Sequence, residues 1–248
     1  MKNFKKLVKT IAAVSTLGLG FATVSISEAQ AALLVPQREG EIKLTNFDTD
    51  PNFNCLTGNC IDTESELGYK VTSFAFGDFD ASRLFSDQRK DPNTYTDGAI
   101  IINFLAEDEG TNPQEDQFYL RPVAFKDGAV AEEGRLEVGL FEFDFGRTIS
   151  EIKLDFFDVE YAESTTIFVD GVAQTVGHGD DSNIQSVVLT DLSKFKVQLG
   201  EPGGRFKTGD GVSLQVSVPE SENLIGLSAL AVAGVLTLKR RKRASLKA

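Results

Sequence analysis

The sequence is poor in several residue types that carry catalytic, redox and metal chemistry. Its 248 residues include no Trp, one His, one Met and two Cys. The two Cys, without further ligands or a Cys-x-x-Cys spacing, exclude the usual cysteine-based zinc and redox sites. No helical period is evident between residues 41 and 218. The chain is instead rich in Phe, Gly and acidic residues, with 19 Phe, 22 Gly and 37 Asp or Glu.

The first 31 residues are typical of a secretory signal peptide. Four Lys precede an apolar segment at residues 11–26, and Ala29 and Ala31 form a small-x-small cleavage pattern. Polar residues near position 27 end the apolar segment too early for a retained membrane anchor. We therefore expect signal peptidase to release a mature chain that begins near Ala32.

The C-terminal part of the sequence contains three segments in a defined order. The motif Val218, Pro219, Glu220, Ser221 precedes an apolar run at residues 224–238, and a basic cluster follows, made of Lys239, Arg240, Arg241, Lys242 and Arg243. Fifteen helical residues span roughly 22 Å, which predicts a short transmembrane helix. The basic cluster would remain in the cytoplasm, so the preceding residues would lie outside the inner membrane. An ordinary single-pass anchor is the alternative.

This order of motif, helix and basic tail resembles the PEP-CTERM sorting signal. The resemblance implies recognition by an exosortase of a Gram-negative bacterium and cleavage near the Pro-Glu motif. The commoner motif has a second proline where this sequence has Ser221. The expected domains are a signal peptide at 1–31, one exported domain at 32–218 and a sorting signal at 219–248.

The expected exported domain is strongly acidic. Residues 32–218 contain 15 basic and 34 acidic residues, a net charge of −19. Such a charge repels nucleic acids and anionic lipid surfaces, so nucleic-acid binding is excluded as a function. A length of 187 residues allows one well-buried core. The close pair Cys55 and Cys60 predicts a disulfide that closes a small loop in an oxidising compartment.

Short strand-like runs separated by Gly, Asp, Asn and Pro predict an all-β fold. The frequent turn signals favour an antiparallel β-sandwich, jelly-roll-like, with a phenylalanine-rich interior. Asp170-Gly171 is the strongest short hairpin signal. The expected strands are residues 41–46, 70–76, 99–105, 118–125, 136–145, 149–157, 165–170, 172–176, 184–189, 195–199 and 212–218.

The parity of the apolar residues changes within residues 136–145. Apolar residues occupy even positions up to Leu140 and odd positions from Phe141. A strand alternates with a period of two, so this change predicts a β-bulge near residues 139–141. We expect Leu136, Val138, Phe141, Phe143 and Phe145 to face the core and Glu137, Glu142 and Asp144 to face water. Gly146 and Arg147 would form a turn into the next strand.

The run Leu136, Glu137, Val138, Gly139, in a chain with this C-terminal signal, resembles the LEVG family of PEP-CTERM proteins known from cyanobacteria. The segments 34–44 and 60–62 are consistent with that group, and the resemblance covers essentially the whole chain. The family name records a sequence feature. The resemblance therefore implies an exported protein and no particular reaction.

The sequence offers candidates for four kinds of binding or catalytic site. His178, beside Asp180, Asp181 and Ser182, invites a Ser-His-Asp interpretation, but an exposed hairpin tip is favoured because triad residues are rarely sequence neighbours. Asp48, Asp50 and Asn52 place oxygen ligands at alternate positions, which makes Ca²⁺ a possible cofactor, although the segment departs from the EF-hand pattern. Carbohydrate binding through exposed Tyr residues is a further alternative, and a glycan-acting hydrolase with paired carboxylates is another.

Together these features predict an exported, non-enzymatic protein of the cell envelope or extracellular matrix, with no catalytic residues. It would be anchored in the inner membrane during transit and then occupy the periplasm, the outer surface or the matrix. The expected partners are signal peptidase, an exosortase, the inner membrane and exopolysaccharide.

Overall fold

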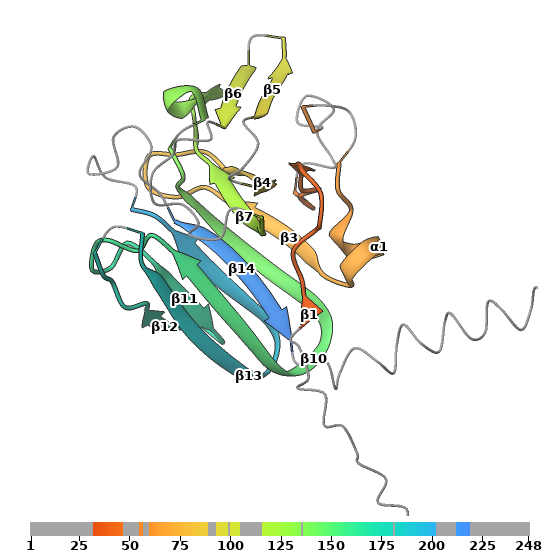
Figure 1. Cartoon of the computed structure of the whole chain (residues 1–248), viewed down its shortest axis with the longest axis vertical. Helices are drawn as coiled ribbons and strands as arrows, with labels where there is room; N and C mark the ends of the chain where they lie inside the picture. The colour runs from red at the N-terminus through yellow and green to blue at the C-terminus, as the bar shows by residue number, and fades with distance from the viewer. Residues whose placement is uncertain are drawn as a thin grey trace, which may run out of the picture.

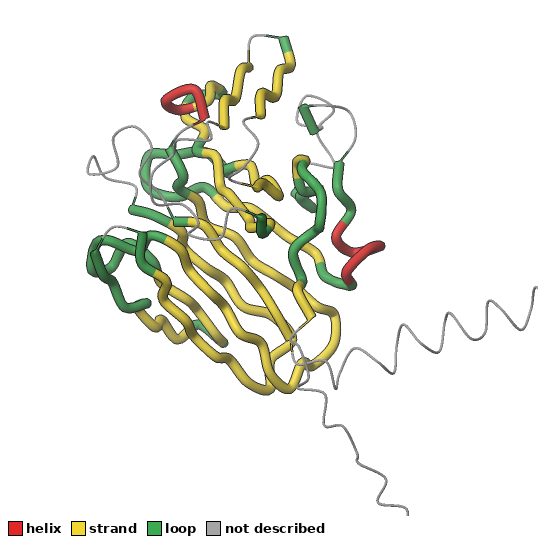
Figure 2. The backbone as a smooth tube through the Cα atoms, viewed as in Figure 1, coloured by secondary structure: helices red, strands yellow, loops and turns green. Residues whose placement is uncertain are grey.

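The computed structural model describes residues 32–46, 55–56, 60–88, 93–98, 100–104, 116–134, 136–180, 182–201 and 212–218. Strands make up most of this part of the chain, and its two short helices lie at the periphery (Figure 2). These are α1 (Thr63–Leu67) and the 3-10 helix η1 (Ala131–Gly134). The prediction of a mostly β, antiparallel fold is confirmed.

Most strands belong to one ten-stranded antiparallel sheet (Figure 1). The strands are β1 (Ala32–Leu33), β2 (Gly40–Glu41), β3 (Lys70–Phe74), β4 (Arg83–Gln88), β5 (Asn93–Asp97), β6 (Ile100–Phe104), β7 (Phe118–Val123), β8 (Phe125–Lys126), β9 (Ala129–Val130), β10 (Gly139–Phe157), β11 (Thr166–Val169), β12 (Val172–Thr175), β13 (Ile184–Leu199) and β14 (Ser213–Val218). The large sheet has the order β12-β11-β13-β10-β14-β7-β4-β2, with β1 beside β14 and β3 beside β10. The hairpins β5–β6 and β8–β9 form separate two-stranded sheets.

The two longest strands, β10 and β13, pair with each other along their lengths. Between Asp144 and Ile149, β10 advances five residues, while β13 advances only two, from Lys194 to Leu192. The additional residues of β10 leave the ladder as a bulge, and a bulge bends a strand. The bend is visible at the lower right of Figure 1, where the middle of β10 curves beside its label.

This register corrects two predictions. The ladder is regular through residues 139–144 and irregular at 145–148, so the predicted bulge near 139–141 was misplaced. Gly146 and Arg147 lie within one continuous strand and do not separate two. The expectation that Glu137 faces water was also wrong, because Glu137 is fully buried. The change in apolar parity arises because residues 136–138 are buried on both faces: Leu136 and Val138 pack in a separate apolar cluster, and a buried carboxylate occupies position 137.

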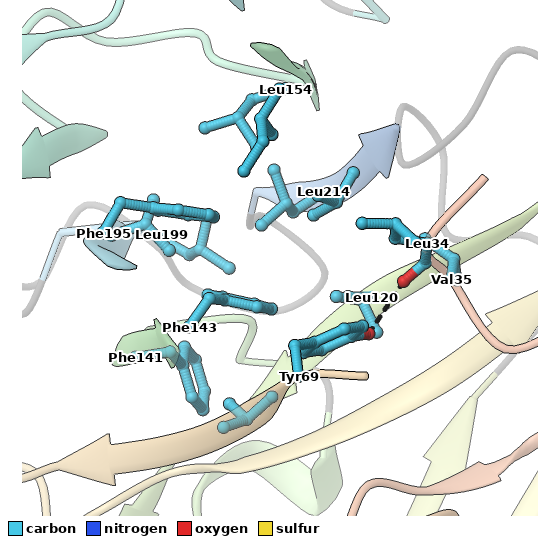
Figure 3. Close-up of a cluster of buried hydrophobic side chains, with 14 of the residues drawn as sticks. Leu34, Val35, Tyr69, Leu120, Phe141, Phe143, Leu154, Phe195, Leu199 and Leu214 are labelled. Carbon is cyan, nitrogen blue, oxygen red and sulfur yellow. Dashed lines mark hydrogen bonds between the residues drawn. The ribbon is translucent and has the colours of Figure 1, made fainter. Parts of the chain in front are cut away.

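Side chains from both halves of β10 fill the main core. Phe143, before the bulge, and Leu154, after it, belong to the same cluster of buried apolar residues. Phe143 stacks on Phe195 of β13 with ring centroids 5.0 Å apart (Figure 3). In the same cluster, the Tyr69 hydroxyl donates a hydrogen bond to the Leu34 carbonyl at 2.7 Å. The predicted phenylalanine-rich interior is confirmed.

Strands β4 and β7 are buried on both faces. Leu84 and Leu120 belong to the main core, whereas Phe85 and Val123 belong to a second apolar cluster with Phe104 of β6. The hairpin β5–β6 therefore contributes to a second packed layer at this end of the sheet. Side chains on the second face of β4 and β7 are removed from water by that layer.

The predicted hairpin at Asp170-Gly171 is confirmed. The two residues connect β11 to β12 and have φ values of +50° and +79°. Two successive positive φ angles are characteristic of the type I′ turn that matches strand twist. Asp127 and Gly128, with φ values of +53° and +75°, connect β8 to β9 in the same way.

The first and last described strands pair with each other. Ala32 of β1 lies opposite Val218 of β14, and Leu33 lies opposite Ser217. The amide of Leu34 donates to the carbonyl of Val216 at 2.7 Å. The residues next to the two predicted terminal signals therefore lie side by side.

Candidate functional site

A groove of about 560 Å³ lies across β10, β13 and β11. Leu140 and Glu142 line it from β10, Lys194 and Lys196 from β13, and Phe168 from β11. The turn residues Asp170 and Gly171, which follow β11, also contribute to the lining. The groove therefore combines apolar side chains with groups that donate and accept hydrogen bonds.

Strand alternation brings these side chains together. Phe141, Phe143 and Phe145 face the core, so the even-numbered residues of this half of β10 point to the opposite face. The register places Glu142 opposite Lys196, and Lys196 opposite Phe168. A row of acidic, basic and aromatic residues thus crosses three neighbouring strands.

Opposite charges balance each other in the groove. Lys194 Nζ lies 3.7 Å from Glu142 Oε2. The Lys196 ammonium lies 3.9 Å from the centroid of the Phe74 ring, within the range of a cation–π interaction. The lining has two lysines and two carboxylates, whereas residues 32–218 carry a net charge of −19. The groove is therefore less repulsive to an acidic ligand than the domain as a whole.

The four residues of the LEVG-like run are all buried. Leu136 and Val138 belong to a small apolar cluster with Ala124. The Val138 carbonyl accepts a hydrogen bond from Ser82 Oγ at 2.7 Å. Gly139 lies beneath the Phe141 ring, where an added Cβ would come within 2.4 Å of a ring carbon. The run is thus a packing element in this structure.

Glu137 belongs to a buried charge cluster with Glu41, Arg83, Asp87 and Arg121. Arg121 Nε lies 2.6 Å from Glu137 Oε1, and its Nη1 lies 3.2 Å from Asp87 Oδ2. Arg83 pairs with Glu41. All five side chains are at most 2% exposed. Ion pairs this deeply buried lose much hydration, so removing one partner is costly.

Aromatic rings cover both arginines of the buried charge cluster. The guanidinium carbon of Arg121 lies 4.4 Å from the centroid of Phe104, and that of Arg83 lies 5.2 Å from the centroid of Phe125. A desolvated guanidinium gains a favourable interaction with a ring face. The second packed layer therefore stabilises the cations as well as excluding water from them.

Burial changes the ionisation of the carboxylates in this cluster. Desolvation raises the pKa of Glu41 and of Asp87, and the neighbouring Arg83 and Arg121 oppose that shift only in part. Burial also raises the pKa of the nearby Tyr95 hydroxyl. The titratable groups of the buried charge cluster are distant in sequence from the groove residues and lie on other strands.

The predicted disulfide between Cys55 and Cys60 is present, with Cα atoms 5.4 Å apart. The segment next to it contacts the buried charge cluster. The amide of Leu56 donates to Glu41 Oε2 at 2.7 Å, and the Leu56 side chain packs in the second apolar cluster. The disulfide therefore holds a residue that covers the Glu41–Arg83 pair.

The structure places the other sequence candidates away from the groove lining. His178 and Asp180 are exposed on the loop between β12 and β13. Tyr69, Tyr95 and Tyr119 are buried and Tyr161 is half-buried, so the tyrosines form no exposed row for a sugar.

Many predicted site residues lie outside the described residues. They are Ala29, Ala31, Asp48, Asp50, Asn52, Asp181, Pro219, Glu220, Ser221, Lys239, Arg240, Arg241, Lys242 and Arg243, together with the apolar run at 224–238. Within the described ranges, no three His, Cys, Asp or Glu side chains are placed to hold a metal ion. No helix in the part of the chain that the structure describes is long and apolar enough to cross a membrane.

Sequence analysis missed both the groove and the buried charge cluster. The groove has no local signal, because three strands that are not all consecutive in sequence assemble it. The buried charge cluster has a weak local signal, because Arg83, Phe85 and Asp87 alternate along the sequence and so share one face of a strand. In comparisons with known proteins, the chain matches no family model, no curated protein and no solved structure.

Proposed function

We propose that this chain is an exported, non-enzymatic envelope or matrix protein that binds polysaccharide in the groove across β10, β13 and β11. Its architecture in this proposal is a jelly-roll-like β-sandwich whose layers are joined through the bend in β10. Its terminal segments are a cleaved signal peptide and a PEP-CTERM-type sorting signal, and its group is the LEVG family.

The combination of side chains in the groove supports this function. A sugar ring presents C–H groups on its faces and hydroxyls at its edges. Phe168 and Leu140 offer apolar surface, while Glu142, Lys194 and Lys196 offer hydrogen-bonding groups beside it. Ligand sites generally combine apolar surface with a few placed polar groups in this way. The near-neutral lining also admits a ligand that the acidic remainder would repel.

The sequence of the two ends supports export. The leader, the Pro-Glu motif, the apolar run and the basic cluster occur in the order that sorting by an exosortase requires. Intact mass spectrometry of the protein recovered from envelope and medium tests this part. A product from about Ala32 to Pro219 is expected. Retention of Lys239 to Lys247 would indicate a permanent anchor and would contradict the proposed cleavage near the Pro-Glu motif.

Binding is tested with exopolysaccharide isolated from the producing cells. We expect the purified protein to sediment with it, and Phe168→Ala to weaken binding about fivefold through loss of the aromatic surface. Lys196→Gln should also weaken binding. Lys153→Gln is the matched control, because Lys153 is exposed on the other half of β10 and pairs with Asp155. Equal binding by all variants would overturn the groove as the site.

A further inference from the structure

The first half of β13 is an edge strand. β13 pairs with β10 along its length, but β11 pairs only with residues 196–198 of β13. Among the described strands, none pairs with the other side of residues 184–190. Their backbone therefore presents donors and acceptors to a further strand.

This edge lacks the features that usually prevent strand addition. Residues 184–190 include no charged residue, no Pro and no Gly. Natural edge strands are generally protected by charges, prolines, bulges or short length. Val188 is 54% exposed and Ile184 is 43% exposed. On the same side of the sheet, beyond β11, the terminal strand β12 has only four residues, so the first half of β13 is the longer unprotected edge there.

We propose that residues 184–190 pair antiparallel with the same residues of a second copy of this chain. A twofold axis at Val187 places Ile184 opposite Thr190 and Ser186 opposite Val188. Each pair has the same parity, so the core face of one sheet continues into that of the other. The ten-stranded sheets of two molecules would then form one sheet.

The absence of charge on this edge allows a second copy to approach it. Two domains with a net charge of −19 repel each other, so they can approach closely only where the contacting surface is uncharged. In the proposed register the seven paired residues carry no charge, and Asp191 faces Asn183 instead of another acid. A charged partner would find no complementary group on this strand. Salt screens the remaining repulsion, so association should strengthen with ionic strength.

The test is the mass in solution of the protein purified from cells, measured by light scattering up to roughly 100 µM, a range suited to micromolar dissociation constants. We expect a dimer, and we expect Val188→Lys to weaken dimerisation at least about tenfold by placing like charges at the interface. Val172→Lys is the matched control, because Val172 is also an exposed valine on an edge strand. It should leave the dimer intact.

Hydrogen exchange gives a second readout that does not depend on a variant. Backbone amides within residues 184–190 should exchange more slowly at high than at low protein concentration, while those of β12 should not change. A monomer at all concentrations would overturn the proposal. So would a dimer that Val188→Lys does not weaken, or one that Val172→Lys disrupts instead. Because neither readout involves polysaccharide, failure here leaves the proposed binding function unaffected.

Discussion

Arg121 Nε and Glu137 Oε1 lie 2.6 Å apart at a place that water does not reach. Glu137 also accepts a hydrogen bond from Ser213 Oγ at 3.1 Å. The glutamate of the LEVG-like run thus connects β7 and β14 through its carboxylate. This gives the run a structural role at the point where the sheet meets its second packed layer.

Replacement of Glu137 should strongly destabilise the fold. Glu137→Gln removes a charge that a buried guanidinium needs, and we expect the free energy of unfolding to fall by about 3 kcal/mol. Urea denaturation followed by circular dichroism measures the change. Glu142→Gln on the adjoining strand β10 is the control, since its partner Lys194 is exposed and such pairs contribute less than about 1 kcal/mol. Similar effects of the two substitutions would contradict the role assigned to Glu137.

Gly139→Ala should also be destabilising, for a steric reason. The new Cβ would overlap the buried Phe141 ring, and overpacking of this kind costs about 1–3 kcal/mol. Thermal unfolding measures the loss. In the control, Gly177→Ala, the nearest atom is the side-chain oxygen of Gln185, which can move. A melting temperature equal to that of the wild type would show that the backbone at Gly139 is less confined than described.

The Glu41 carboxyl should make stability depend on pH. Burial raises its pKa in the folded protein above the ordinary value of 4.5, so the folded protein retains this proton to higher pH than the unfolded chain. The contribution of the protonated Glu41 carboxyl to the free energy of unfolding is therefore full below pH 4.5. It decreases as the pH rises through the pKa of Glu41 in the folded protein.

Glu41→Gln removes this titration and provides the measurement. The unfolding free energy of the wild type minus that of Glu41→Gln should decrease as the pH rises above 4.5. Urea denaturation at a series of pH values gives both quantities. A difference that stays constant would mean that the pKa of Glu41 is not raised, and one that increases with pH would mean that Arg83 outweighs burial and lowers it.

Loss of the disulfide should loosen the cover over the Glu41–Arg83 pair. Replacing both Cys55 and Cys60 by Ser should cost about 2 kcal/mol, as expected for a short closed loop. The Leu56 amide, which donates to Glu41, should exchange with solvent faster. Hydrogen exchange read by NMR distinguishes this from a uniform loss of stability, because core amides of β10 should keep their relative protection. Unchanged exchange at Leu56 would show that the loop stays in place without the bridge.

Local patterns predicted the features that depend on neighbouring residues. The hairpin at Asp170-Gly171 was predictable because these residue types favour two successive positive φ angles. The Cys55–Cys60 disulfide was predictable from the short spacing of the two cysteines. Strand β4 was missed because Arg83 and Asp87 resemble surface residues, and they are buried only by the tertiary packing of the second layer over this face. The bulge in β10 was misplaced for the same reason, since a buried Glu137 depends on Arg121 from another strand. The groove depends on register between β10, β13 and β11, which no local window contains.

The pairing of Ala32 with Val218 gives the folded domain a single point of attachment. Whatever precedes the first strand and whatever follows the last one must leave the domain from the same place. Trimming at both ends would leave the new amino and carboxyl groups as neighbours, held by the β1–β14 ladder. A short peptide could then join them, and a circularly permuted chain opened at the Asp170-Gly171 turn would have every strand in its original place.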